Sequence, residues 1–318
     1  MAPASSGETV VSSVPSNRRR LTFFSRKSTD ERLDWVAAVP FFGLHLLAVV
    51  GLFYFGFSWK GFGLAIALYY FRMFGVTGGY HRYFSHKTFE TSRVFQFLLA
   101  FFAMTSTQKG VLWWASHHRI HHKRSDKPDD VHSRKQHGFI WSHLGWIVSH
   151  RHDETEWSEI QDLAKYPELR FINKHHHLPT VLYVIVLYLA GGPFAVFWGF
   201  CVSTTLLWHG TFTINSLAHW LGRRRYDTTD ESKNSLLLAL VALGEGWHNN
   251  HHYYPKACNQ GFYWWEIDIT YYVIRTLEAL RIVWNVETPP KAIRDRRMVR
   301  RKVESTPDTL QGEPVAAE

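Results

Sequence analysis

Long apolar stretches alternate with polar segments along the chain. The first apolar stretch contains no Asp, Glu, Lys or Arg and is long enough for a membrane span of ~20 residues. The second is interrupted by Arg72, which could snorkel or serve a site near the end of its helix. Residues 178–219 are again uncharged but too long for one span, so a hinge is expected at Gly191-Gly192-Pro193. The pattern predicts an all-α integral membrane protein with four transmembrane helices, which cover about 35–57, 61–80, 178–191 and 194–219.

The polar segments between and after these stretches are expected to form a helical cap. They cover residues 81–175 and 220–303 and contain most of the 20 histidines. Residues 94–105 are apolar but too short to span, which favours a helix on the membrane face or a re-entrant segment. The two ends, 1–30 and 304–318, are polar, and we expect both to be disordered, outside a membrane domain of residues 31–303.

Charge and composition support this organisation. The formal net charge is +9, and the short connections between the predicted spans contain only Lys60, so the positive-inside rule places the termini and the cap in the cytosol. This fits a multi-pass protein of a bacterial inner membrane or the endoplasmic reticulum. The basic runs suit lipid headgroups or acidic ligands, and no nucleic-acid partner is expected. Two cysteines are too few for a disulfide framework or an iron-sulfur cluster.

Histidine spacing is the strongest chemical signal. The segments HRIHH and HNNHH repeat one arrangement, i, i+3 and i+4, which places three imidazoles on one side of a helix. Asn215 precedes His219 by one turn, so both side chains are expected to face one object. His81 and His86, separated by four residues, lie where the second span is expected to emerge. Together these positions give nine well-placed histidines, which are His81, His86, His118, His121, His122, His219, His248, His251 and His252.

Nine imidazole nitrogens exceed the positions of one ion, so we infer two transition metals. A closed zinc site leaves no position for chemistry, whereas iron with open positions binds oxygen. Nine other histidines are interpreted as solvated side chains, which are His45, His132, His137, His143, His150, His152 and 175–177.

The three boxes HRYFSH, HRIHH and HNNHH, with NSLAH before the last, resemble those of membrane fatty-acid desaturases of the stearoyl-CoA desaturase type. The resemblance implies that the nine histidines ligate two iron ions and that Asn215 holds an iron-bound water. No catalytic residue beyond these ligands is implied. His117 lies outside the family pattern, and its role is open.

The same resemblance implies an oxygen-dependent reaction that introduces a cis double bond, at carbon 9, into a long saturated acyl chain. A CoA thioester is the expected carrier, with an acyl-lipid as the alternative. The sequence shows no haem-binding cytochrome b5 module, so electrons are expected from a separate ferredoxin, cytochrome b5 or reductase.

Further side chains are expected to support the metals and the acyl chain. Carboxylates usually orient metal-bound imidazoles, and the candidates are Asp126, Asp129, Asp130, Glu245 and Asp268. An apolar tunnel for the acyl chain is expected beneath the cap, with walls from Tyr69, Tyr70, Trp113, Trp114, Trp146 and Trp247. Tyr69 and Tyr70 are expected to limit its depth.

Two other classes stay open on sequence grounds. A membrane di-iron alkyl hydroxylase or ketolase would use the same histidines and would form oxygenated products. A histidine-rich metal transporter would place its ligands near the bilayer midplane, whereas these boxes follow the ends of the predicted spans.

Overall fold

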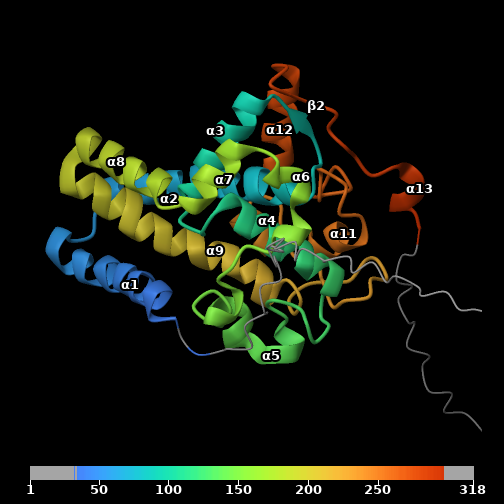
Figure 1. Ribbon diagram of the computed structural model, residues 1–318, viewed down its shortest axis with the longest axis horizontal. Coiled ribbons are helices and arrows are strands. Elements are labelled where there is room, and N and C mark those ends of the chain that lie inside the picture. The colour runs from blue at the N-terminus through green and yellow to red at the C-terminus, as the bar shows by residue number, and fades with distance from the viewer. Residues whose placement is uncertain (1–31, 33, 297–318) are drawn as a thin grey trace, which may run out of the picture.

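The computed structural model describes residue 32 and residues 34–296, and this part of the chain is mostly helical, as predicted (Figure 1). The predicted disordered segments, 1–30 and 304–318, lie outside it. A two-stranded antiparallel sheet pairs β1 (Glu90–Thr91) with β2 (Val283–Trp284). The α-helices are α1 (Trp35–Phe55), α2 (Trp59–Phe74), α3 (Arg93–Met104), α4 (Val111–Arg124), α5 (Arg134–Ile140), α6 (Gln161–Ala164), α7 (Pro167–Lys174), α8 (Leu178–Val196), α9 (Ser203–Leu217), α10 (Leu236–Val241), α11 (His248–Tyr253), α12 (Ile269–Ala279) and α13 (Lys291–Arg294). The π- and 3-10 helices are η1 (Gly75–Ser85), η2 (Trp141–Gly145), η3 (His150–His152), η4 (Trp157–Glu159) and η5 (Phe197–Val202).

Two stretches among the described residues are long and apolar enough to cross a membrane, Ala38–Phe55 and Leu178–Leu217. The first forms most of α1, which begins where the Asp34 carboxylate accepts a hydrogen bond from the Val36 N–H at 2.8 Å. Its outer side chains are strongly exposed, with Phe53 at 87%. Exposed apolar surface of this extent favours contact with lipid.

The second stretch folds back on itself. The backbone leaves helical geometry at Gly191 and Gly192, and Gly192 has φ 60°, a conformation that favours glycine because it has no Cβ. The arm before this bend is the first part of α8, and the arm after it consists of the end of α8, η5 and α9. The two arms run antiparallel (Figure 1). The Tyr183 hydroxyl donates to the Gly199 carbonyl across the arms at 2.8 Å. The bend predicted at this Gly-Gly-Pro sequence is therefore confirmed.

Helix α2 is shorter than the predicted span of 61–80. It has 16 residues and continues directly into the π-helix η1, so a span here is not confirmed by length and composition. Arg72 does not snorkel, because its side chain is fully buried. Its guanidinium donates to the hydroxyls of Ser203 and Thr204, each at 2.8 Å, and to the Thr105 carbonyl at 3.1 Å. These neutral acceptors join α2 to the start of α9 and to the end of α3.

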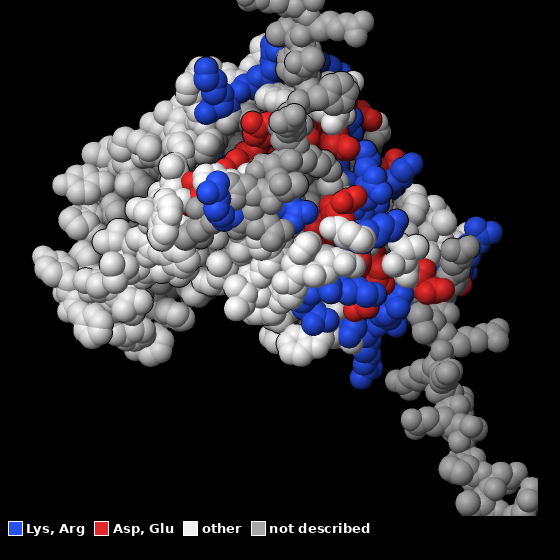
Figure 2. Space-filling model, turned by 60° about the horizontal axis from the view of Figure 1, so that its bottom comes forward, with Lys and Arg blue, Asp and Glu red and all other residues white. Residues whose placement is uncertain are grey.

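The apolar helices and the polar segments lie at opposite ends of the molecule. In Figure 1, α1, α8 and α9 extend to the left, whereas α4, α11, α12 and α13 lie to the right. Figure 2 shows the Lys, Arg, Asp and Glu side chains gathered over the right part of the face in view, while the left part is white. This separation agrees with an apolar region that contacts lipid and a polar cap.

The π-helix η1 lies at the centre of the fold and packs closely on α3. A Cβ added at Gly75 would lie 3.0 Å from the Ala103 Cα, and one added at Gly79 would lie 3.1 Å from the Ala103 Cβ. Real side chains at either position would force the two helices apart. Small residues therefore let η1 lie deep in the structure, where it brings its histidines to the cap.

Candidate metal centre

Two groups of histidine nitrogens converge in the buried interior of the cap. In each group one ligand atom from every member lies within 4.8 Å of the others. The five-histidine cluster consists of His81, His86, His118, His122 and His251. The four-histidine cluster consists of His121, His219, His248 and His252. The structure thus brings together all nine histidines selected by spacing, in two groups, while their role as ligands stays a prediction.

The π-helical geometry of η1 explains how His81 and His86 meet. Five residues on an α-helix turn the chain by about 500°, which would leave two side chains about 140° apart. A π-helix closes i→i+5 hydrogen bonds instead, and the His86 N–H donates to the His81 carbonyl at 3.2 Å. Residues five apart therefore lie one above the other, and the two ring centroids are 4.8 Å apart.

Helices α4 and α11 each supply both clusters. On α4, His118 and His122 are four residues apart and join the five-histidine cluster, whereas the intervening His121 joins the other cluster. On α11 the arrangement is reversed, since His251 alone faces the five-histidine cluster. The i, i+3, i+4 pattern therefore spans two adjacent sites. His219 follows α9 and completes the four-histidine cluster.

The distances between the ring nitrogens in these clusters agree better with a shared metal ion than with hydrogen bonds between the rings. The Nε2 atoms of His81 and His122 lie 3.1 and 2.9 Å from the Nε2 of His251, and a single N–H cannot serve both contacts. In the other cluster, His219 and His248 approach through Nε2 atoms at 3.1 Å. Imidazole nitrogens bound about 2.1 Å from one ion lie about 3.0–3.4 Å apart. The observed separations agree with such a coordination shell.

Two further nitrogens support this fit. Within the described residues, the buried Nε2 atoms of His121 and His252 meet no hydrogen-bonding partner. An unpaired buried nitrogen is costly, by ~1–3 kcal/mol, unless something satisfies its lone pair. Transition-metal ions such as iron and zinc accept neutral imidazole nitrogen, so the donor set fits a metal centre.

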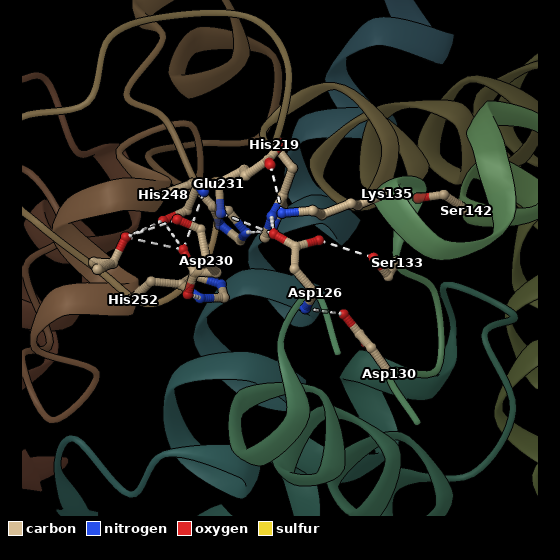
Figure 3. A network of polar contacts seen from close by, with 12 residues as sticks. Asp126, Asp130, Ser133, Lys135, Ser142, His219, Asp230, Glu231, His248 and His252 are labelled. Atoms are coloured by element: carbon tan, nitrogen blue, oxygen red, sulfur yellow. Dashed lines mark hydrogen bonds and ion pairs between the residues drawn. The ribbon is translucent and has the colours of Figure 1, made fainter. Parts of the chain in front are cut away.

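Carboxylates orient four of the nine rings. Glu245 accepts from the Nδ1 of His81 at 2.5 Å, and Asp130 accepts from the Nδ1 of His121 at 2.8 Å. Asp126 accepts from the Nδ1 of His219 at 2.9 Å (Figure 3). Because each Nδ1 carries the proton, the opposite Nε2 presents its lone pair to the cluster. Three of the carboxylates proposed from sequence thus take this position.

The fourth carboxylate, Asp230, was missed by sequence reasoning. It accepts from the Nδ1 of His252 at 2.7 Å (Figure 3). Asp230 lies 22 residues before His252 in a loop, and no spacing rule connects the two. Of the other candidates, Asp268 is buried but binds Arg82 at 2.9 Å, and Asp129 is exposed.

Burial determines the protonation of both partners. Burial, reinforced by neighbouring imidazoles, holds the pKa values of His86, His118 and His122 well below the usual range. These rings are therefore neutral near pH 7, as metal ligation requires. Burial alone would raise the pKa of Asp126, but the hydrogen bond from His219 holds it well below its usual value. The same balance, set by His252, lowers the pKa of Asp230.

A large pocket of about 520 Å³ opens beside the clusters. Its lining includes Trp113, Trp114 and Trp146 from the predicted tunnel, together with His118 and Asn215. A second void of about 40 Å³ shares Trp114, His118 and Asn215 with it and also touches His121 and His248, so the inner end of the pocket adjoins both clusters. The pocket lies within the ~300–1,000 Å³ typical of small-molecule sites.

The other predicted tunnel residues lie outside this lining. Tyr69 is buried and donates its hydroxyl to the Val241 carbonyl at 2.7 Å, and Tyr70 is 39% exposed. Trp247 donates its indole N–H to the Ile267 carbonyl at 2.8 Å. In this structure the large pocket is therefore bounded by other side chains, among them Trp208 and Phe212.

Several histidines interpreted as solvated are in fact engaged. His132 is buried, and its ring lies 4.2 Å from that of His121. His45, His209 and His143 form a chain of ring-to-ring contacts, each 2.9 Å long. His117, whose role the sequence left open, is also buried, with its Nδ1 3.0 Å from the Trp113 carbonyl, and it lines the large pocket.

A mostly helical protein with apolar helices, two buried histidine clusters and an adjoining pocket has the features of a membrane-associated metalloenzyme. The model of the fatty acid desaturase family matches residues 57–285, so the chain belongs to that family. It is 34% identical over 267 residues to the sn-1 stearoyl-lipid 9-desaturase of Anabaena variabilis, which covers 83% of this chain and 97% of the relative. It is 36% identical to the icosanoyl-CoA 5-desaturase of Limnanthes douglasii over 284 residues, 86% of this chain and 78% of the relative. Delta-9 acyl-lipid desaturase 2 of Arabidopsis thaliana is 35% identical over 290 residues, 89% of this chain and 91% of the relative. The sequence-based prediction of a fatty acid desaturase is confirmed at the level of the family.

Proposed function

We propose that this protein is an oxygen-dependent desaturase that introduces a cis double bond at carbon 9 of a long saturated acyl chain. The observation that carries the proposal is the position of the large pocket, whose inner end adjoins both clusters at Trp114, His118 and Asn215. An acyl chain in this pocket would lie directly beside the proposed metals. The 9-desaturases among its relatives support the position of the double bond.

The nine histidines hold two iron ions in this proposal. The five-histidine cluster binds one ion and the four-histidine cluster the other. Asn215, which lines the small void that touches both clusters, would hold a water ligand. The irons, when bound, supply the activation of O2 that removes hydrogen from two adjacent, otherwise unreactive methylene groups. The four carboxylates keep the rings in the ligating tautomer.

The protein's own contribution is to position the acyl chain. Trp114 stacks on the His118 ring with centroids 5.0 Å apart and on Tyr80 at 5.3 Å, which fixes one wall of the pocket beside the five-histidine cluster. Phe41 of α1 and Phe212 of α9 also contribute walls of the pocket. An extended chain between these walls presents a limited set of carbons to the clusters, which determines where the double bond forms.

The polar groups of the pocket favour a membrane lipid over CoA as the acyl carrier. Lys109 is the pocket's basic residue, and its ammonium is already paired with Asp153 at 3.0 Å. Asp34 adds a second acid, so the charge of these three residues is −1 (1 − 2). Several phosphates on CoA would require free cations there. The relatives named above include lipid and CoA enzymes, so a CoA thioester, expected from the sequence, is the second candidate.

We propose four membrane-crossing segments: α1, α2 with the part of η1 up to residue 80, and the two arms of the α8–α9 hairpin. The exposed apolar side chains of α2, with Trp59 at 78% and Phe71 at 61%, support its contact with lipid. An even number of crossings places both ends of the chain and the cap on one side, which the basic charge assigns to the cytosol. A separate donor on that side would supply the electrons.

Expression in a host without its own acyl desaturase tests the reaction. Mass spectrometry of the lipids is expected to show monounsaturated chains with the bond at carbon 9, and a His118→Ala variant at equal abundance is expected to show none. If the lipids instead contained hydroxylated or keto chains, the proposed desaturase would be wrong and a hydroxylase or ketolase would be favoured. Unchanged lipids despite bound iron would overturn the proposal and favour metal transport.

A second assay separates the carriers. The purified protein in nanodiscs of distearoyl phosphatidylcholine or distearoyl phosphatidylglycerol, supplied with reduced ferredoxin or reduced cytochrome b5, is compared with the same protein given stearoyl-CoA. Desaturation of the nanodisc lipid supports the lipid carrier. Desaturation of stearoyl-CoA without desaturation of the nanodisc lipid would refute the lipid carrier.

A further inference from the structure

The two clusters differ in the carboxylates that face their imidazoles. In the four-histidine cluster, three of four rings donate Nδ1–H to an acid: His121 to Asp130, His219 to Asp126 and His252 to Asp230. In the five-histidine cluster, one such pair involves a member ring, His81 with Glu245. The cluster with fewer imidazoles therefore has more carboxylate support.

The surroundings of the acids enlarge this difference. Glu245 shares its charge with a buried cation, because the Arg82 guanidinium donates to its Oε1 at 3.1 Å. Asp126 and Asp230 accept further hydrogen bonds from neutral groups, the hydroxyl of Ser133 at 2.8 Å and the N–H of Ser232 at 3.0 Å. Neutral donors stabilise a carboxylate without cancelling its charge. Asp126 and Asp230 therefore keep their full negative charge, whereas the charge of Glu245 is partly offset by Arg82.

The balance can be written for each proposed metal position. Three aspartates beside the four-histidine cluster contribute −3. Beside the five-histidine cluster, Glu245 contributes −1 and Arg82 contributes +1, and Asp268, which pairs with Arg82, contributes a further −1 farther from the rings. These groups are buried, where charge acts over several ångströms with little screening by water. A carboxylate behind an imidazole also makes the ring a stronger base toward metal.

We propose that the four-histidine cluster is the high-affinity metal position and fills first, with the five-histidine cluster filling second. This inference rests on the proposed function in one respect, that both clusters bind metal. Asp126, Asp130 and Asp230 are the positioning residues that establish the order. The greater number of imidazoles at the other cluster does not compensate, because four of its five rings are not paired to a carboxylate by the described contacts.

Metal titration of the detergent-purified apoprotein tests the order directly. Co2+ is added in fractions of an equivalent while its ligand-field absorption is recorded, and the same series is repeated with 57Fe2+ and Mössbauer spectroscopy. We expect two resolved steps of one ion each, with distinct spectra. His219→Ala is expected to remove the tight step, and His86→Ala the weak one, which assigns each step to a cluster.

Isosteric variants then test the carboxylates. Asp230→Asn is expected to weaken the tight step by about 10–100-fold and to leave the weak step unchanged. Glu245→Gln is the matched control, since it removes the acid behind His81 and is expected to weaken the weak step alone. Far-ultraviolet circular dichroism and thermal unfolding of each apoprotein show whether a variant has lost its fold, and Asp126→Asn replaces Asp230→Asn if that variant fails.

The outcomes distinguish this inference from the function on which it rests. Two ions that bind with equal affinity, or a tight step that Glu245→Gln weakens and Asp230→Asn does not, would overturn the order while leaving a two-metal enzyme. Failure to bind two ions at all would overturn the proposed metal centre itself.

Discussion

Asn173 holds the start of the helix that carries three of the proposed ligands, so its replacement tests how the site is supported. Helix α4 begins after Gly110, which has no side chain to cap it. Asn173 of α7 supplies the missing acceptor, because its Oδ1 receives the N–H groups of Leu112 at 2.9 Å and Trp113 at 3.0 Å. Both of these residues are buried, so neither N–H would regain a hydrogen bond from water easily.

We expect Asn173→Leu to destabilise the fold. Each of two buried N–H groups would lose its acceptor, which costs about 1–3 kcal/mol. After partial relaxation the free energy of unfolding should fall by about 2–4 kcal/mol. For chains of this order of size, 1 kcal/mol moves the unfolding midpoint by roughly 2–4 °C, so the midpoint should fall by at least ~4 °C. The assay is thermal unfolding of detergent-purified protein followed by tryptophan fluorescence at equal metal content.

Asn173→Asp is the matched control. It keeps the acceptor and adds a negative charge at a helix N-terminus, a gain of about 0.3–1 kcal/mol. It loses one long hydrogen bond, from the Asn173 Nδ2 to the Thr155 hydroxyl at 3.3 Å. The midpoint of this variant should stay within a few degrees of the natural protein. If Asn173→Leu and Asn173→Asp lowered the unfolding midpoint equally, the acceptor at this position would not be what stabilises the start of α4.

Three more outcomes are expected. Removing metal with a chelator should lower the temperature of the unfolding midpoint, because unpaired nitrogens such as His121 Nε2 would stay buried without a metal ion. Adding Fe2+ should restore the midpoint and adding Ca2+ should not. An unchanged midpoint after chelation would contradict the proposed metal centre. Thr211→Trp, which fills part of both voids, should shift the products toward shorter chains in lipid analysis, and an unaltered profile would exclude this pocket as the acyl site. Burial alone would raise the pKa of Asp162, but hydrogen bonds from Arg119 and Lys87 lower it to about 2. The ionised carboxylate therefore stabilises the fold above pH 4, and this stabilisation is lost as the pH falls toward 2, so Asp162→Asn should flatten that part of the acid-unfolding curve. Superimposable curves for the variant and the natural protein would refute this role of Asp162.

Much of the grouping of the histidines could be predicted from sequence because it depends on local geometry. Spacings of three and four residues bring rings together on any α-helix, so HRIHH and HNNHH were recognisable before the fold was known. The division of His118, His121 and His122 between two clusters was not, since it depends on how α4 and α11 cross. His81 and His86 needed a π-helix, and their spacing of five gives no signal on an α-helix.

Features set by tertiary contact were missed or misread. Asp230 reaches His252 from a loop 22 residues away, and its sequence context resembles an ordinary turn. His132 has no helical partner, yet the fold buries it beside His121. The apolar pattern located α1 and the bend at Gly191-Gly192 well, because lipid-facing runs and glycine turns are local properties. It also marked Tyr69 and Tyr70 as tunnel walls, although composition does not indicate which side of a helix faces a pocket.

Because α4 and α11 each contribute histidines to both clusters, the two proposed metal positions depend on the same two helices. Helix α11 has only six residues, yet it provides His251 to one cluster and His248 and His252 to the other. If α11 fluctuates away from the cap, both positions lose ligands in the same event. A single substitution can remove a histidine from one cluster alone, whereas a movement of the α11 backbone removes histidines from both. Opening of α11 that releases the ion from one proposed position would therefore also leave the other position short of ligands.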